Sequence, residues 1–225
     1  MSAFAAAMFT QIREPERDVS FRMRIVDGQA MDCPCRDFLQ LRLEEETLVR
    51  VCLGSQQIPR VLDIGCGLGR HSIFVQSLAP RAAITLVESD QELRDYCFRR
   101  ITDARGYEQF DALPEDSRFN LALLMGNGLG IFGAEEAAFQ GLEKLHGLMD
   151  SDGSVLIESG NFAPCDYYSA RHEIEYDGVV DGPFTWGYAT RDWLQRYLAA
   201  VGFRVISVTP STRGEPFFIC HAKAC

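Results

Sequence analysis

The residues with the clearest chemical potential in this 225-residue chain lie in one short stretch, residues 63–69, which reads Asp-Ile-Gly-Cys-Gly-Leu-Gly. Glycine occupies every second position, at Gly65, Gly67 and Gly69, between a short apolar run and a segment of helical periodicity. Glycine adopts backbone angles closed to other residues and lets the main chain approach a ligand closely. The N-terminus of the following helix offers free N–H groups to an anion. The stretch therefore predicts a binding loop made of main chain.

A second feature is the acid that ends the next apolar run, Ala83–Glu88. A carboxylate has two oxygens and no donor, so Glu88 at a strand end can accept hydrogen bonds from two vicinal hydroxyls. Together with the glycine stretch, this acid predicts a site at the carboxyl ends of two neighbouring strands.

The glycine-rich stretch resembles the D-x-G-x-G-x-G loop of class I S-adenosylmethionine-dependent methyltransferases, and residues 58–160 follow the pattern of that family. The resemblance implies that the loop wraps the methionine end of S-adenosyl-L-methionine, with Asp63 near its amino group, and that S-adenosyl-L-homocysteine is the product. It also implies that Glu88 binds the ribose and that Asp111 and Ala112 bind the adenine. The implied cofactor-binding residues are Asp63, Gly65, Cys66, Gly67, Gly69, Glu88, Ser89, Asp111, Ala112 and Gly126.

The tripeptide Gly126-Asn127-Gly128 after the next apolar run bears on the acceptor. It lacks the proline-rich, aromatic signature of family members that methylate nucleobase or glutamine amides. The resemblance therefore implies methyl transfer to an O, N or S nucleophile of a small molecule, with no nucleic-acid partner.

Catalytic candidates follow from position, because ligands of open α/β sheets bind at the carboxyl ends of the strands. Transfer of an activated methyl group needs mainly alignment, and a general base only where the acceptor loses its proton early. No single catalytic residue is assigned, and each candidate also has a purely structural interpretation. The candidates at strand ends or in the segment 160–190 are Asn127, Glu158, Tyr167, Tyr168, His172 and Trp186.

Two other classes of protein stay open. A dinucleotide-binding loop would place its third glycine at position 70, which is Arg70 here, so a nicotinamide-dependent reductase is disfavoured. A protein that keeps the methyltransferase fold as a binding or assembly module without turnover would carry the same loop and the same acids.

The elements that must position these residues follow an alternating pattern of short apolar runs and helical segments, typical of a parallel sheet covered on both faces. We expect an α/β fold, a seven-stranded, mostly parallel, doubly wound sheet with an antiparallel C-terminal hairpin. The predicted strands are Arg60–Ile64, Ala83–Glu88, Phe119–Met125, Ser154–Glu158, Phe203–Val208 and Pro216–His221, and the predicted helices are Arg70–Leu78, Gln91–Arg100, Ala134–Met149 and Asp192–Val201.

Two segments fall outside this alternation. Residues 1–57 are expected to cap the core, with an N-terminal packing helix, a strand pair around Asp27-Gly28 and a helix at Leu43–Leu53. Residues 160–190 are rich in Gly, Pro, Tyr and acids and show no clear element. They are expected to form an irregular lid within the catalytic domain, residues 58–225.

The composition of the chain limits the binding partners and the cellular compartment that we expect. The chain has 22 Lys and Arg against 32 Asp and Glu, a net charge of −10, which argues against binding to nucleic-acid phosphates. No run is apolar enough to span a membrane, and eight cysteines without an expected leader peptide indicate reduced thiols in the cytoplasm. Cys33 and Cys35 form the only close pair, so no metal site is expected. A homodimer through the N-terminal segment is left open.

Overall fold

A seven-stranded sheet forms the core of the computed structural model, which describes residues 1–26, 28–54, 58–162 and 165–225. The order is β10-β11-β7-β6-β3-β4-β5, with parallel pairing from β7 to β5 and antiparallel pairing of β11 with both β7 and β10. This confirms the predicted α/β fold and its C-terminal hairpin. The strands are β3 (Arg60–Ile64), β4 (Ala83–Val87), β5 (Arg105–Tyr107), β6 (Phe119–Leu124), β7 (Met149–Gly160), β10 (Phe203–Pro210) and β11 (Phe217–Ala224).

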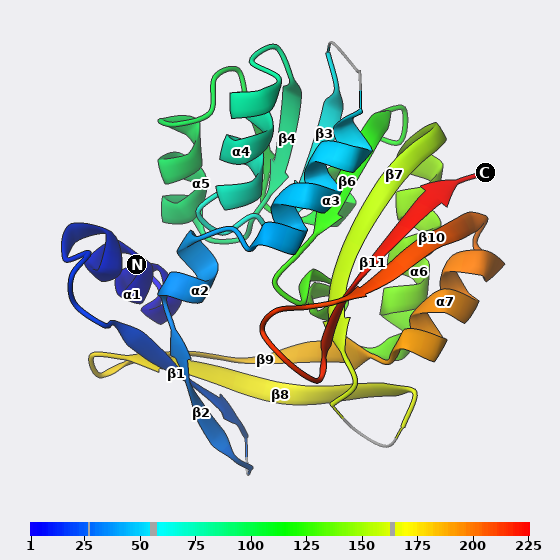
Figure 1. Ribbon diagram of the computed structural model, residues 1–225. Coiled ribbons are helices and arrows are strands. Elements are labelled where there is room, and N and C mark those ends of the chain that lie inside the picture. Colours follow the sequence, from blue (N-terminus) through cyan, green and yellow to red (C-terminus); the bar gives the residue numbers. More distant parts are fainter. Residues whose placement is uncertain (27, 55–57, 163–164) are drawn as a thin grey trace.

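Helices cover both faces of this sheet (Figure 1). Most residues of its central strands β3 and β6 are therefore apolar and buried on both faces, with Asp63 as a buried exception. Along β6, Leu121 and Leu123 belong to the core under α3, α4 and α5, whereas Ala122 and Leu124 belong to the core under α6 and α7. The alternation of side chains along a strand thus divides the core into two layers. The helices are α3 (Leu43–Leu53), α4 (Arg70–Leu78), α5 (Gln91–Phe98), α6 (Glu135–Leu148) and α7 (Arg191–Ala200).

A second, four-stranded antiparallel sheet of order β2-β1-β8-β9 is built from two distant parts of the chain. Its strands are β1 (Ser20–Ile25), β2 (Ala30–Pro34), β8 (Tyr167–Tyr176) and β9 (Val179–Ala189). The expectation that residues 160–190 form no regular element is therefore wrong, because Tyr167–Tyr176 and Val179–Ala189 are strands, while the role of this segment as a lid stays a prediction. β8 and β9 are joined at Asp177-Gly178, where both residues have a positive φ, as a tight hairpin turn requires.

The N-terminal region joins the two sheets. Helix α1 (Ala3–Arg13) and the short α2 (Arg36–Leu39) share an apolar cluster with β1, β2, Leu68 of the glycine loop and Leu93 of α5. The predicted strand pair and the helix Leu43–Leu53 are confirmed, while Asp27 lies outside the described residues. Figure 1 shows the four-stranded sheet lying across the carboxyl-terminal edge of the larger sheet.

Two short turns, the state of the cysteines and the lengths of the helices complete the description of the fold. Two 3-10 turns, η1 (Phe110–Ala112) and η2 (Gly128–Phe132), follow β5 and β6. All eight cysteines are free thiols. Within the described part of the chain, no helix combines the length and the hydropathy needed to cross a lipid bilayer.

Candidate active site

The loop between β3 and α4 forms the first wall of the candidate site. Gly65, Gly67 and Gly69 all have a positive φ, which explains the alternate glycines. A Cβ atom added at Gly69 would lie 2.9 Å from the sulfur of Cys97, so this glycine lets α5 pack closely. A Cβ atom added at Gly67 would meet no described atom within 4 Å. The main chain at Gly67 therefore borders open space.

The loop after β6 forms the opposite wall. β3 and β6 are parallel neighbours with Asp63 opposite Leu123, so the two loops leave the sheet side by side. Gly126 has a φ of 67° and, like Gly67, has no described atom within 4 Å of an added Cβ. Its N–H donates to Oε2 of Glu158 at 2.7 Å. Two glycine turns thus flank a space that any side chain would fill, and such a cradle fits a ligand held by main chain.

Glu88 closes the cradle from the end of β4. Its Oε2 accepts the N–H of Gly67 at 2.9 Å, and its Oε1 accepts the N–H of Asp90 at 3.0 Å. Burial raises the pKa of Glu88, and these backbone hydrogen bonds oppose the shift. The hydroxyl of Ser89 also lies 3.5 Å from Oε1, whereas Oε2 has Gly67 as its one donor among the described residues and can accept a further hydrogen bond.

Asp63 supports the junction between β3 and α4. It is 2% exposed, and the hydroxyl of Ser72 donates to its Oδ2 at 2.6 Å. Burial raises the pKa of Asp63, whereas the nearby His71 and the Ser72 hydroxyl lower it. The side chain therefore holds the first turn of α4 to the strand that carries the glycine loop.

The other predicted cofactor residues differ in placement. Cys66 is buried in the loop, and Ser89 follows Glu88 on the surface. Asp111 and Ala112 of η1 are exposed, and the Asp111 carboxylate is 90% exposed with Nζ of Lys144 3.4 Å away. The structure thus brings Glu88 to the glycine loop and leaves the Asp111 side chain at the surface, and the adenine role of Asp111 stays a prediction.

A buried charged cluster, which the sequence did not predict, supports both loops. Glu45 and Glu158 are fully buried, and one guanidinium nitrogen of Arg42 lies 2.6 Å and 2.7 Å from their respective Oε1 atoms. Arg70 also contacts Glu45 at 2.8 Å, and Arg213 contacts Glu158 at 3.7 Å. These ion pairs connect the start of α3, the start of α4, β7 and the β10–β11 loop. Because its oxygens are engaged in this way, Glu158 is placed to position Gly126.

The remaining catalytic candidates lie on or against the second sheet. Asn127 has a φ of 62°, and its Nδ2 donates to the carbonyl of Gly187 on β9 at 3.2 Å. Among the described residues, the buried Oδ1 of Asn127 has no hydrogen-bond partner. A Cβ atom added at Gly130 would lie 2.0 Å from the Trp186 Nε1, so the indole packs directly on η2.

Tyr167 and Tyr168 point to opposite faces of β8, as neighbours on a strand must. The hydroxyl of Tyr167 donates to the carbonyl of Gly133, and its ring packs on Trp193 with centroids 4.9 Å apart, so Tyr167 belongs to the core. Tyr168 stacks on Tyr188. Tyr188 was missed in the sequence, although aromatic residues alternate along β9 up to this position.

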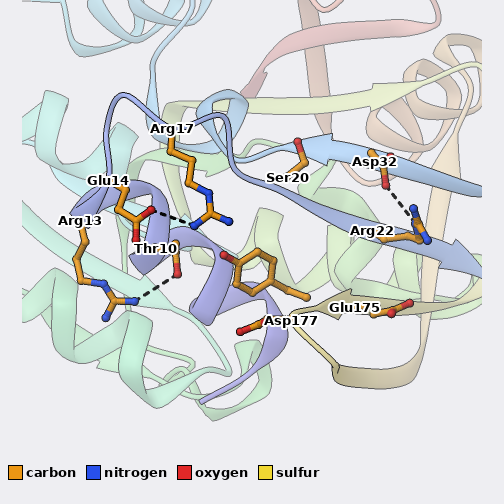
Figure 2. Close-up of a pocket in the computed structure, with 10 residues that line it drawn as sticks. Thr10, Arg13, Glu14, Arg17, Ser20, Arg22, Asp32, Glu175 and Asp177 are labelled. Carbon is orange, nitrogen blue, oxygen red and sulfur yellow. Dashed lines mark hydrogen bonds and ion pairs between the residues drawn. The ribbon is translucent and has the colours of Figure 1, made fainter.

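A separate charged hollow of about 650 Å³ lies between α1 with its following turn and the strands β1, β2 and β8 (Figure 2). Thr10, Arg13, Glu14 and Arg17 of α1 and the following turn line one side of it. Its ion pairs, such as Arg17 with Glu14, are exposed, and no residue of either glycine loop lines it. The hollow is therefore distinct from the candidate active site.

Replacement of Glu88 tests this geometry. Glu88→Ala removes the acceptor of two backbone N–H groups and of the expected diol, so we expect affinity for S-adenosyl-L-homocysteine to fall by about 1–3 kcal/mol, the usual cost of losing a charged hydrogen-bond partner. Titration calorimetry measures the change. Glu143→Ala, which removes an exposed acid on α6, is the matched control and should bind as the wild type does. Equal affinity of the Glu88→Ala protein would show that this carboxylate does not face the ligand.

The strand order, the glycine loop and the acid at the end of β4 define the fold of class I S-adenosylmethionine-dependent methyltransferases. No protein-family model and no curated protein sequence matches the chain. Solved structures match it at low sequence identity.

Three of these structures illustrate the likeness. A methyltransferase from Bacteroides fragilis in complex with S-adenosyl-L-homocysteine is 19% identical, with a TM-score of 0.78 over 100% of this chain and 95% of that one. A Burkholderia thailandensis 1,6-didemethyltoxoflavin N1-methyltransferase is 18% identical, with a TM-score of 0.60 over 81% and 77% of the two chains. An amino pentose methyltransferase from Micromonospora echinaspora is 12% identical, with a TM-score of 0.58 over 81% and 89%.

Proposed function

We propose that this protein is an S-adenosylmethionine-dependent methyltransferase that acts on a small-molecule acceptor. The observation that carries the proposal is the open cradle between Gly67 and Gly126, with the Glu88 carboxylate fixed at its side. The Bacteroides fragilis structure, which matches the whole chain, contains S-adenosyl-L-homocysteine, and the Burkholderia thailandensis enzyme contains 1,6-didemethyltoxoflavin together with S-adenosylhomocysteine. Both support the proposal.

When bound, S-adenosylmethionine supplies a methyl group that its positively charged sulfur has already activated. The chain must then hold the two reactants in line and keep water out, and such alignment alone supplies much of the acceleration. Glu88 would hold the ribose, and the main chain at Gly67 and Gly126 would border the methionine part. The second sheet, which packs on η2 through Trp186, would cover the acceptor.

Calorimetry with S-adenosyl-L-methionine, S-adenosyl-L-homocysteine and NADH tests the proposal. We expect saturable binding of the two sulfur nucleosides with one site per chain and no heat with NADH. Binding of NADH in their place would assign the protein to the reductases. Tight binding of the sulfur nucleosides without methyl transfer to any member of a broad panel of hydroxyl, amine and thiol acceptors would favour a binding module.

A further inference from the structure

A tyrosine and a histidine are hydrogen-bonded to each other on the face of the second sheet that is turned toward the active site. His172 Nδ1 lies 2.9 Å from the carbonyl oxygen of Ala170, and only a protonated nitrogen can donate to that oxygen. The neutral ring then carries its lone pair on Nε2. The Tyr188 hydroxyl lies 3.0 Å from Nε2 and therefore donates to it. The two side chains form an ordered chain for one proton.

A chain of side-chain contacts connects this pair to the cofactor cradle. Tyr188 packs against Phe162, which packs against Phe217, with centroids 4.7 Å and 4.9 Å apart. The guanidinium of Arg213 lies over the Phe217 ring at 3.9 Å and also contacts Glu158, the residue that holds Gly126. Tyr188 is thus connected to Gly126 in the wall of the cradle through four side chains, those of Phe162, Phe217, Arg213 and Glu158.

The face of the second sheet that carries His172 and Tyr188 also contacts segments next to both loops of the cradle. Trp186, two residues before Tyr188 on β9, packs on η2, and Phe21 and Cys33 share an apolar cluster with Leu68 of the glycine loop. The pair lies between these two contacts in the sheet, since His172 pairs with Ile25 on β1 and with Phe184 on β9.

His172 and Tyr188 differ in burial, and burial shifts the pKa of each so that His172 can accept a proton and Tyr188 keeps its own. His172 is 1% exposed, whereas Tyr188 is half-buried. Burial lowers the pKa of His172, so the ring is neutral at pH 7. Burial, with Cys33 and Tyr168 adding to it and Arg213 opposing it, raises the pKa of Tyr188 to about 12, so the hydroxyl keeps its proton until that proton can move to the histidine.

We propose that Tyr188 is a catalytic residue that takes the proton from an aromatic hydroxyl acceptor while His172 takes the proton of Tyr188, an inference that rests on the proposed methyl transfer. The acceptor oxygen bonds to the methyl carbon as the carbon–sulfur bond breaks, and that electron pair stays on sulfur. The acceptor proton moves to the Tyr188 oxygen and the tyrosine proton moves to Nε2. The positive charge lost from sulfur is thus balanced by the imidazolium, which later releases its proton to solvent.

The surroundings of the pair favour a planar aromatic acceptor. Tyr168, Phe184 and Trp186 are half-buried rings on the same face of β8 and β9 as His172 and Tyr188. Aromatic faces pack well against another ring in offset or edge-to-face geometry. A hydroxyl on such a ring also gains from a base, because it must lose its proton as the methyl group is transferred.

Two phenols of different acidity distinguish a role of Tyr188 and His172 in proton transfer from a purely structural role of the two residues. 4-Methylphenol has a hydroxyl like that of tyrosine, with a pKa of about 10, whereas 4-nitrophenol is ionised near neutral pH. With labelled S-adenosylmethionine, we expect Tyr188→Phe and His172→Asn to slow methylation of 4-methylphenol by about 100- to 10,000-fold, the usual contribution of a general base. Methylation of 4-nitrophenol should be nearly unchanged. Tyr176→Phe, at the far end of β8, is the control and should behave as the wild type with both phenols.

The pH profile and the histidine spectrum give independent readouts. For 4-methylphenol, the wild-type rate should rise with pH through a midpoint below 6.5, the usual value for histidine, and then stay level, and His172→Asn should lose this rise. In nitrogen NMR of the S-adenosyl-L-homocysteine complex, His172 should carry its proton on Nδ1, and Tyr188→Phe should shift its Nε2 resonance. The chain has four histidines, so His172→Asn assigns the signal by difference.

The outcomes that would overturn the relay are distinct from those that would overturn the proposed function. If the wild-type protein binds no S-adenosyl-L-homocysteine, both the relay and the proposed function are wrong. If the protein binds S-adenosyl-L-homocysteine but methylates neither phenol, the proposal of an aromatic hydroxyl acceptor is wrong. Equal loss of activity toward both phenols in Tyr188→Phe, or a His172 proton on Nε2, removes the relay while the proposed methyl transfer stands.

Discussion

Gly67→Leu should abolish measurable binding of S-adenosyl-L-homocysteine, a loss of at least about 100-fold, or about 2.7 kcal/mol, while the protein remains folded. The added side chain would project from main chain at φ 55° into the space where no described atom lies within 4 Å of a Cβ. It therefore occupies the cradle without displacing the core. The left-handed backbone itself costs about 1–2 kcal/mol of stability for a residue other than glycine.

Gly178→Leu is the matched control for this variant. Gly178 lies in the β8–β9 turn at φ 78° and also has no described atom within 4 Å of an added Cβ, so the backbone cost is the same. We expect the two variants to lose similar stability in thermal unfolding and only Gly67→Leu to lose binding in calorimetry. Wild-type affinity in Gly67→Leu would place the ligand elsewhere.

Glu45→Ala should give the largest loss of stability, about 3–5 kcal/mol, the range for removing one partner of a buried ion pair. The carboxylate accepts the backbone N–H of Arg42 at 2.8 Å and contacts the side chains of Arg42, Arg70 and His71. Its removal leaves the buried guanidinium of Arg70 without this carboxylate, while Arg42 keeps Glu158 as a partner. For a chain of this size the midpoint of thermal unfolding should fall by about 6–20 °C. Glu46→Ala, a half-exposed acid next in the helix, should cost less than about 0.5 kcal/mol.

The pH dependence of the same variant gives a second check. Burial favours the neutral form of Glu45, but His71, Arg70 and Arg42 together lower its pKa from 4.5 to about 2. A lowered pKa in the folded state adds stability above pH 4.5, here about 3 kcal/mol, and that stability is lost as the pH falls toward about 2. Urea unfolding should therefore show a gap between wild type and Glu45→Ala that narrows over this window. A gap independent of pH would show that the charge of Glu45 contributes little.

The larger sheet could be predicted from the sequence because its strands are short, apolar on both faces and separated by amphipathic helices. Arg60–Ile64 and Arg70–Leu78 match the structure at both ends. The three-residue β5 was not predicted, since Arg105–Tyr107 is too short and too polar to show a pattern. β7 extends beyond the predicted Ser154–Glu158 because backbone pairing continues into residues that are not apolar.

The β8–β9 half of the second sheet was missed for a different reason. β8 and β9 are largely half-buried, so their side chains alternate between polar and aromatic and form no apolar run. The signal that was available was Asp177-Gly178, a typical hairpin dipeptide, flanked by alternating aromatic residues. The same type of dipeptide at Asp27-Gly28 did predict the pairing of β1 with β2.

The candidate site was predictable only where local sequence determines geometry. Alternate glycines require positive φ angles, and Glu88 follows directly from the end of its strand. Arg42 and Glu45 are neighbours at the start of α3, but Glu158 lies 116 positions from Arg42, and nothing in the local pattern of either segment indicates that they meet. The pairing of His172 with Tyr188 likewise depends on the hairpin register that brings β8 and β9 together.

The central claim is that a sulfur nucleoside lies between the two glycine turns, and a crystal structure of the protein grown with S-adenosyl-L-homocysteine tests it most directly. We expect density for the ligand with its ribose hydroxyls on the carboxylate of Glu88 and its amino acid part between Gly67 and Gly126. Density in another place, such as the hollow beside Arg17, or a Glu88 carboxylate that makes no contact with the sugar, would contradict the account.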